Sequence, residues 1–271
     1  MSKDFSVKFW GVRGSCPTPG KQTIKFGGNT PCIELRIGDK TLIMDAGTGI
    51  RELGLNLQQN NKDLDIDIFI THTHWDHIQG FPFFSPLYKS KNTFTIYGYK
   101  DLDKLITGQF QKSFFPVQFN DLKSKIEFKI LANNNSISLN DEIRVSTMFT
   151  NHVGENLAYK LESDNKTLCY LGDLEHSAKS ESALINFVKG ADLIIYDAKY
   201  TDEEYLNSKS GRGHSTWQEG VKLVQAAGAD KLILFHHSPL RSDEELEQIE
   251  KLAQAAYNKA VVAKEGMVIN L

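Results

Sequence analysis

The chain has 271 residues, of which 40% are hydrophobic and 24% are charged. This composition excludes a wholly disordered chain, and the length fits one layered domain, which we take as residues 1–271. Lys and Arg number 31 and Asp and Glu number 34, which leaves a net charge of −3. A polyanion binder that relies on a broad basic surface is therefore disfavoured, and nucleic acid with it.

Targeting signals are not visible in the sequence. Asp4 interrupts the N-terminal segment before any apolar core of signal-peptide length, and no run approaches the about 20 apolar residues of a membrane helix. The three Cys residues lack C-x-x-C spacing, which disfavours both a disulfide framework and a cysteine zinc knuckle. We therefore expect a cytoplasmic protein with no membrane partner.

Short apolar runs dominate the first two thirds of the chain and predict strands more often than helices. In chain order, we expect strands at 6–10, 31–37 and 41–44, a helix at 50–59, strands at 67–70 and 93–97, a helix at 101–111 with Asp101 as N-cap, and strands at 125–131, 143–149, 156–161 and 167–171. Gly38–Asp39 is expected to form the turn between the second and third strands, and 133–135 another turn.

The last third alternates between helix and strand. It predicts a helix at 180–189, a strand at 192–196, a helix at 215–227, a strand at 231–235, a helix at 242–259 and a strand at 267–269. Gly190 and Gly228 are expected to end two of these helices, and Ser242 with Glu245 to begin the third as a capping box. The pattern indicates an α+β fold in which two mixed β-sheets pack face to face and helices flank them.

Histidines gather at the end of one predicted strand. The strand at 67–70 is followed by His72, His74, Asp76 and His77. Strand ends are a common place for ligand sites, and four such groups would be costly in a packed core without partners. Neutral imidazole and carboxylate are ligands that suit zinc, so the cluster predicts a metal site. The alternative is four solvated polar residues in a loop.

The spacing H-x-H-x-D-H after a buried strand resembles the signature of the metallo-β-lactamase superfamily. The resemblance extends from the Asp45-Ala-Gly turn to His236 and implies a four-layer αββα sandwich with a two-metal site between its sheets. It also implies three further ligands, each after a predicted strand: His152, Asp173 and His236.

The resemblance divides these residues between two metal ions. It assigns His72, His74 and His152 to one ion and Asp76, His77 and His236 to the other, with Asp173 bridging both. His237 is the alternative to His236. We favour His236, because it holds the position of the last ligand in the family. Zinc is the expected metal, with manganese or iron as alternatives. Secreted β-lactamases of this fold commonly carry Cys where this chain has Asp173, and flavodiiron oxidoreductases carry an acidic residue where it has His74. The chain therefore resembles these two groups less than it resembles other members of the superfamily.

The charge of such a site favours an anionic substrate. Two divalent ions bring about +4, and Asp76, Asp173 and a bridging hydroxide remove about three charges, which leaves roughly +1 to attract a phosphodiester. Two metals about 3.5–4 Å apart lower the pKa of a bridging water and stabilise the attacking and leaving oxygens. Asp76 is expected to accept a hydrogen bond from that water and to act as the base. The charge of the site alone does not exclude carboxylate or thioester substrates.

A second motif, Gly-Arg-Gly-His-Ser-Thr at 211–216, precedes a predicted helix whose N-terminus would attract anions. With the later Leu-Ile-Leu-Phe-His-His-Ser-Pro run, it resembles the branch that contains ribonuclease Z, PhnP and cyclic nucleotide phosphodiesterases. The resemblance implies that His214 donates a proton to the leaving oxygen and that Asp197, where ribonuclease Z usually has Glu, orients it. A helix cap for His214 and a structural hydrogen bond for Asp197 are the alternatives.

The branch narrows the predicted substrate. No counterpart of the tRNA-clamping arm of ribonuclease Z is visible between Asp173 and His214. We therefore predict hydrolysis of a small phosphodiester, such as a cyclic nucleotide or cyclic phosphate, by a metal-bridging hydroxide. The alternatives are a ribonuclease Z-like RNA endonuclease, a thioester or lactone hydrolase, and a low-turnover accessory protein like PqqB. The resemblance also suggests a homodimer.

Further residues are assigned to the substrate pocket. Gly-rich loops allow close backbone approach, so we expect Arg13, Ser15, Asn29 and Thr30 to line the pocket, with tight turns as the alternative. The aromatic segment 81–88 would stack a base or cover the site, or else pack in the core or in a dimer contact. His176 has no predicted role and is expected at the surface.

Overall fold

The computed structural model describes residues 4–59 and 62–271. Residues 1–3 belong to the N-terminal segment in which we expect no export signal, and they lie outside the described residues. Within the described ranges, none of the helices combines the length and the apolar character that crossing a membrane requires.

The first sheet contains seven strands in the order β14-β1-β2-β3-β4-β5-β6. They are β1 (Phe5–Gly11), β2 (Cys32–Ile37), β3 (Lys40–Met44), β4 (Asp65–Phe69), β5 (Thr93–Gly98), β6 (Lys125–Ile130) and β14 (Val268–Asn270). Strands β14, β1, β2 and β3 pair antiparallel, whereas β3, β4, β5 and β6 pair parallel. The predicted turn at Gly38 joins β2 to β3, with a φ of 56° that glycine tolerates.

The second sheet repeats this plan with seven strands in the order β13-β12-β11-β10-β9-β8-β7. They are β7 (Ser136–Ser138), β8 (Arg144–Thr150), β9 (Asn156–Ser163), β10 (Lys166–Tyr170), β11 (Leu193–Asp197), β12 (Lys231–Phe235) and β13 (Ala260–Val262). One half is antiparallel, β7 to β10, and the other half is parallel, β10 to β13. Both sheets are therefore mixed, as predicted.

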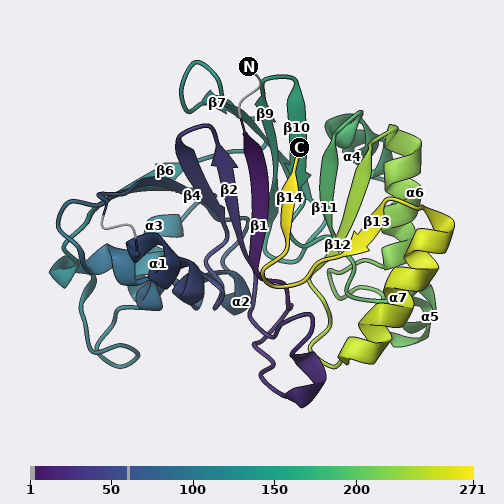
Figure 1. The fold of residues 1–271 in the computed structure, drawn as a ribbon, viewed down its shortest axis with the longest axis horizontal. Helices are drawn as coiled ribbons and strands as arrows, with labels where there is room; N and C mark the ends of the chain where they lie inside the picture. The colour runs from purple at the N-terminus through teal and green to yellow at the C-terminus, as the bar shows by residue number, and fades with distance from the viewer. Residues whose placement is uncertain (1–3, 60–61) are drawn as a thin grey trace.

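Helices cover the outer faces of the two sheets (Figure 1). They are α1 (Ile50–Gln58), α2 (Trp75–Ile78), α3 (Leu102–Gly108), α4 (Glu181–Val188), α5 (Asp202–Glu204), α6 (Trp217–Ala227) and α7 (Asp243–Ala256). In Figure 1, α1 and α3 lie on the left beside the first sheet, and α4, α6 and α7 lie on the right beside the second. The predicted four-layer αββα sandwich is confirmed.

Strand periodicity explains the layers. Successive side chains of a strand point to opposite faces, so each sheet can bury both faces. In β4, Ile66 and Ile68 join the core beneath α1 and α3, whereas Phe69 joins the core between the sheets. In β11, Ile194 packs toward the outer helices and Ile195 packs between the sheets. Three apolar layers therefore hold four structural layers together.

Several predicted boundaries are wrong for identifiable reasons. Asp101 does precede α3, but its φ is 58° and its carboxylate accepts from Lys104 Nζ at 2.6 Å, so its side chain does not cap the helix. The helix predicted at 242–259 ends at Ala256, because Tyr257 turns to an extended conformation and its hydroxyl donates to the Asp230 carbonyl at 2.8 Å. The capping box at its start is present.

The sequence analysis also missed two strands. β7 spans only Ser-Ile-Ser, and β13 only Ala-Val-Val. Each is three residues long and becomes recognisable only through the neighbouring strand with which it pairs. Short edge strands of this kind carry too little periodicity to be predicted from sequence.

Candidate active site

The segment that follows β4 forms one wall of the candidate site. It runs from Thr71 into the short helix α2, and it presents His72, Asp76 and His77 as buried side chains and His74 as an exposed one. Thr71 anchors its start, since the backbone N–H and the hydroxyl both donate to Asp45 Oδ1, at 2.8 and 3.0 Å. The end of the strand therefore fixes the direction in which the imidazoles project.

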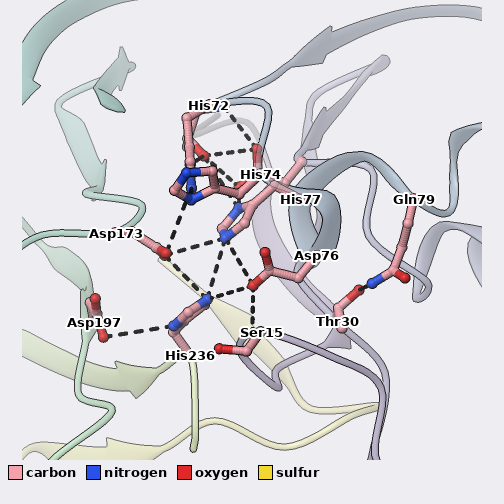
Figure 2. A network of polar contacts seen from close by, with 12 residues as sticks. Ser15, Thr30, His72, His74, Asp76, His77, Gln79, Asp173, Asp197 and His236 are labelled. Atoms are coloured by element: carbon pink, nitrogen blue, oxygen red, sulfur yellow. Dashed lines mark hydrogen bonds and ion pairs between the residues drawn. The ribbon is translucent and has the colours of Figure 1, made fainter. Parts of the chain in front are cut away.

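Loops after three strands of the second sheet supply the remaining groups. His152 follows β8, Asp173 follows β10 and His236 follows β12. Their side chains meet those of the first sheet between the two sheets, as Figure 2 shows for Asp173 and His236. The structure therefore brings together residues that are more than 150 positions apart, for example Asp76 Oδ2 and His236 Nε2 at 3.0 Å.

The donor atoms form two groups that share Asp173. The first contains His72, His74, His152 and Asp173, and the second contains Asp76, His77, Asp173 and His236. Within each group the donor atoms all lie within 4.8 Å of one another. This is the same division that the sequence analysis assigned to two metal ions. Asp197 and His214 also lie within this distance of Asp173 and His236, so a third grouping exists.

The donor set fits divalent cations. His72 Nε2 lies 3.0 Å from His74 Nδ1, and His77 Nε2 lies 3.3 Å from His236 Nε2, so nitrogen atoms face one another. Asp173 Oδ1 is buried and has no hydrogen-bond partner among the described residues. Buried polar atoms are normally satisfied, and a cation would satisfy these lone pairs at once.

The charge states of Asp76, His72 and His74 also suit metal binding. Burial alone would raise the pKa of Asp76, but the neighbouring His77 and the hydrogen bond with His236 hold it well below its usual range. Burial lowers the pKa of both His72 and His74. Ionised carboxylate and neutral imidazole are the forms that bind metal ions.

Asp45 supports the site from beneath. It is fully buried and accepts from His77 Nδ1 at 2.8 Å, from the Tyr170 hydroxyl at 2.6 Å and from Thr71. Because Nδ1 of His77 faces this carboxylate, Nε2 is the nitrogen that faces Asp173 Oδ1, at 3.3 Å, and it is the one that would bind a metal ion. The sequence analysis assigned Asp45 no role, although a carboxylate directly after a strand was a usable signal.

Two glycines let the backbone approach the imidazoles. A Cβ on Gly14 would lie 2.4 Å from the His236 ring, and one on Gly213 would lie 2.7 Å from His152 Nδ1. Gly213 also has a φ of 78°, and its carbonyl accepts from His152 Nδ1 at 2.6 Å. The absence of a side chain at Gly14 and Gly213 therefore lets these loops pack directly against the imidazoles of His236 and His152.

Asp197 and His214 form a second carboxylate–imidazole pair. Asp197 ends β11, and its Oδ2 lies 2.8 Å from His214 Nδ1. Burial alone would lower the pKa of His214, but the charge and the hydrogen bond of Asp197 raise it above its ordinary value. The Asp197 carboxylate therefore favours the protonated form of the His214 imidazole, which is the form suited to proton donation.

The pair opens onto a cavity of about 430 Å³. The lining residues are Ser15, Thr73, His74, Trp75, Asp76, Asp173 and His214. Trp75 is 63% exposed at the rim. Ser15 is the predicted pocket residue that the structure brings here, and its backbone N–H donates to Asp76 Oδ2 at 2.6 Å (Figure 2).

The structure does not bring Arg13, Asn29 or Thr30 to this cavity, which corrects their expected place. Arg13 is fully buried, and its guanidinium donates to the carbonyls of Gly27 and Arg241 at 2.9 and 2.7 Å. The amide of Asn29 donates to Glu265. Thr30 Oγ1 accepts from the Thr48 backbone N–H at 2.8 Å. These three side chains form hydrogen bonds that hold the loops together, which agrees with the alternative expectation that the Gly-rich segments are tight turns.

The remaining histidines lie outside the ligand groups. His237 Nε2 donates to the Ala263 carbonyl at 2.8 Å, and burial lowers its pKa to about 3. His176 is half-buried rather than at the surface, with Nδ1 3.0 Å from Ser215 Oγ. His236 and not His237 therefore faces Asp76 and Asp173.

The aromatic segment is divided between core and surface. Phe81 and Phe84 are fully buried beneath the first sheet. Phe83 is 57% exposed and packs edge-on against Phe115. The Tyr88 hydroxyl donates to the Pro82 carbonyl at 2.8 Å. None of these side chains lines the cavity beside His214, so base stacking by this segment is not supported.

Two charged residues near the site were missed. Lys199 Nζ lies 2.6 Å from Ser15 Oγ and 2.9 Å from His214 Nε2. Glu175 accepts from the Tyr205 hydroxyl and from the backbone N–H groups of Gly211 and Gly213, at 2.6, 2.6 and 2.9 Å. It thereby holds the loop that carries His214. Lys199 stands two residues after Asp197 at a strand end, which was an available signal.

Comparison with known proteins agrees with this architecture. Residues 40–237 match the family model described as "Beta-lactamase superfamily domain", so the chain belongs to the beta-lactamase superfamily. It is a hydrolase of the metallo-β-lactamase fold, a fold whose members bind divalent metal ions.

Individual relatives narrow the branch. Ribonuclease Z of Clostridium novyi (strain NT) is 22% identical, over 98% of this chain and 98% of its own length. The metallo-β-lactamase fold protein YhfI of Bacillus subtilis superposes with a TM-score of 0.76 at 20% identity, with all of both chains covered. A diphosphatase of the PhnP family superposes with a TM-score of 0.73 at 17% identity, over 98% of each chain. The chain is similar to these proteins along its whole length.

Proposed function

We propose that this chain hydrolyses a small phosphodiester with two divalent metal ions, zinc being the expected metal. The observation that carries the proposal is the Asp197–His214 pair beside two ligand groups that share Asp173. A hydrolase that cleaves a thioester has less need of a proton donor next to its ligands, because a thiolate is a stable leaving group, whereas a lactone releases an alkoxide and is separated from a phosphodiester only by assay. A phosphodiester with an alkoxide leaving group requires one.

The residues have separable tasks. His72, His74 and His152 would hold one ion, Asp76, His77 and His236 the other, and Asp173 both. When bound, two such ions polarise the phosphoryl group and lower the pKa of water. His214 protonates the leaving oxygen through Nε2, while Asp197 holds Nδ1 and fixes the ring.

Asp76 accepts a hydrogen bond from the attacking water. Its carboxylate lines the cavity, and Ser15 holds Oδ2 through a backbone N–H. Because its pKa is held well below the usual range, Asp76 orients water better than it retains a proton. This modifies the expectation that Asp76 is the base.

Turnover of bis(p-nitrophenyl) phosphate tests the proposal. Protein reconstituted with zinc, manganese or iron should hydrolyse this diester, and a cyclic nucleotide, faster than a thioester or a lactone. Faster turnover of the thioester would contradict the proposal. No turnover of any compound at full metal occupancy would support an accessory role.

A ribonuclease Z-like activity is the second candidate, since the curated relatives that carry this name match nearly the full chain. The region between Asp173 and His214 contains α4, β11, α5 and a π-helical turn, Tyr205–Lys209, and the described chain has no long arm there. With the net charge of −3, this favours a small substrate. If the protein cleaves a tRNA precursor more efficiently than small diesters, the ribonuclease Z-like activity becomes the first candidate.

A further inference from the structure

A second cavity adjoins the one that contains His214. It has a volume of about 300 Å³ and is lined by Lys199, Tyr200, Lys209 and Arg241, among others. Ser15 lines both cavities, so they meet at this residue. We call the second cavity the Lys199 pocket.

Lys199 has an unusual environment for a lysine. It is only 7% exposed, and among residues 4–59 and 62–271 no carboxylate lies within ion-pair distance of its Nζ. The groups within hydrogen-bond distance of its Nζ are the hydroxyl of Ser15 and Nε2 of His214, and neither carries a negative charge. An ammonium group carries three donors, so at least one remains. A buried charge without a counter-ion is costly, which indicates that an anion completes the site.

Lys209 and Arg241 line the rest of the pocket together with two carboxylates, Glu204 and Glu245, both of which lie within ion-pair distance of Arg241. Lys209 Nζ lies 5.9 Å from the Tyr200 ring centroid, and Lys199 Nζ lies 6.0 Å from it, so one ring contacts both ammonium groups. Lys209 has no carboxylate partner in the described chain either. Arg241 is already paired with Glu204 at 2.6 Å. The two lysines are therefore the cations left to bind a ligand.

The position of Lys199 decides which part of the substrate meets it. His214 Nε2 is the atom that we propose to protonate the leaving oxygen, and Lys199 Nζ lies 2.9 Å beyond it. We propose that the Lys199 pocket binds a phosphate group on the leaving portion of the substrate. This rests on the proposed function and defines the substrate class as a phosphodiester that carries a second phosphate. Two lysines match a phosphate dianion better than a single carboxylate.

The chemical step stays balanced with this assignment. Water adds to phosphorus and the bond from phosphorus to the leaving oxygen breaks, and the proton that the water gives up returns to His214 through solvent after the step. The leaving oxygen takes a proton from His214, and the leaving alcohol departs with its own phosphate still bound at Lys199. No oxidant or additional reactant is required.

Three thymidine dinucleotides test the proposal: TpT without a terminal phosphate, pTpT with a 5′-phosphate and TpTp with a 3′-phosphate. Product analysis shows which nucleoside leaves and therefore which compound carries its second phosphate on the leaving portion. That compound should exceed TpT in kcat/KM by about 10- to 100-fold, the value of one hydrogen bond to a charged group. The compound with phosphate on the retained portion should show little gain.

Variants assign the preference to the pocket. Lys199→Gln should bring the ratio between the two compounds close to one, whatever it does to the rate on TpT. Lys209→Gln should reduce the ratio in part. Lys222→Gln is the matched control, because Lys222 is exposed on α6 and pairs with Glu219 outside both cavities. It should leave the ratio unchanged.

The outcomes separate this inference from the proposed function. If the wild-type protein shows no preference, or if Lys199→Gln keeps it, the pocket does not bind phosphate and Lys199 only supports His214. If the metal-loaded wild-type protein cleaves none of the diesters, the proposed function fails. Calorimetric binding of pTpT, TpTp and TpT to that protein and to Lys199→Gln then decides: a wild-type preference for either phosphorylated compound that the variant loses supports the pocket, and equal binding of all three overturns it.

Discussion

Replacing His214 by alanine separates proton donation from metal binding. His214 Nδ1 lies 2.8 Å from Asp197 Oδ2, and the ring lines the cavity with Asp76 and Asp173. Positioned proton donors contribute about 10²–10⁴ in rate, or about 3–5 kcal/mol of transition-state stabilisation. The raised pKa of His214 keeps the donating form available near neutral pH, so we expect the full loss in kcat at pH 7.

The leaving group controls how large the loss is. p-Nitrophenolate leaves as a stable anion and needs little protonation, whereas the alkoxide of TpT needs it fully. His214→Ala should therefore lower kcat on TpT by about 10²–10⁴ and on bis(p-nitrophenyl) phosphate by about tenfold or less. His176→Ala is the control, since it removes another imidazole near the same loop, at 3.0 Å from Ser215 Oγ, from outside the ligand groups.

Metal content completes the assay. His214 belongs to neither of the two groups that share Asp173 and were assigned to the two metal ions, so the variant should retain its full metal complement by elemental analysis. Its donor atom does lie within 4.8 Å of those of Asp173, Asp197 and His236. Loss of one ion would therefore make His214 a ligand, and an equal loss of rate on both substrates would refute its role as proton donor.

Three further substitutions test the neighbouring groups. Asp173→Ala should lose metal and activity together, and full occupancy with normal turnover would refute the bridging assignment. Asp45→Ala removes the acceptor of Tyr170 and His77 and should lower the free energy of unfolding by about 3–5 kcal/mol in urea titrations, against about 1 kcal/mol for Tyr170→Phe. Asp197→Asn removes the two largest interactions that raise the pKa of His214, keeps the smaller one with Asp173, and leaves burial, which lowers it. The proton-donating form is then lost at lower pH, so the basic limb of the kcat profile should move to lower pH; an unchanged limb would contradict this.

The fold was largely predictable because its signals are local. Buried runs such as Leu193–Asp197 and Lys231–Phe235 have strand length, and Gly228 ends α6 with a φ of 62° as expected. The pairing of strands is not local, and β13 is recognised only because Ala260 pairs with Leu232. Sequence periodicity carries no information on such partners.

The site was predictable only in part for the same reason. The close spacing of His72, His74 and His77 predicts a metal site without further information. The family resemblance adds the distant ligands, which are His152, Asp173 and His236. Arg13 was placed in the pocket because a Gly-rich loop leads to the site. Only the three-dimensional structure shows that the guanidinium of Arg13 donates hydrogen bonds to the Gly27 and Arg241 carbonyls instead. Lys199 stands two residues after Asp197, but its significance comes from burial without a counter-ion, which only the three-dimensional structure shows.

Two carboxylate–histidine pairs in this chain have the same length and different consequences. Asp45 lies 2.8 Å from His77 Nδ1, and Asp197 lies 2.8 Å from His214 Nδ1. In each pair the carboxylate fixes one nitrogen and directs the other. Nε2 of His77 faces a buried acidic group at 3.3 Å, where a cation is the natural partner. Nε2 of His214 faces Lys199 and an open cavity, where a substrate can arrive. The surroundings of the second nitrogen, and not the pair itself, therefore distinguish a metal ligand from a proton donor.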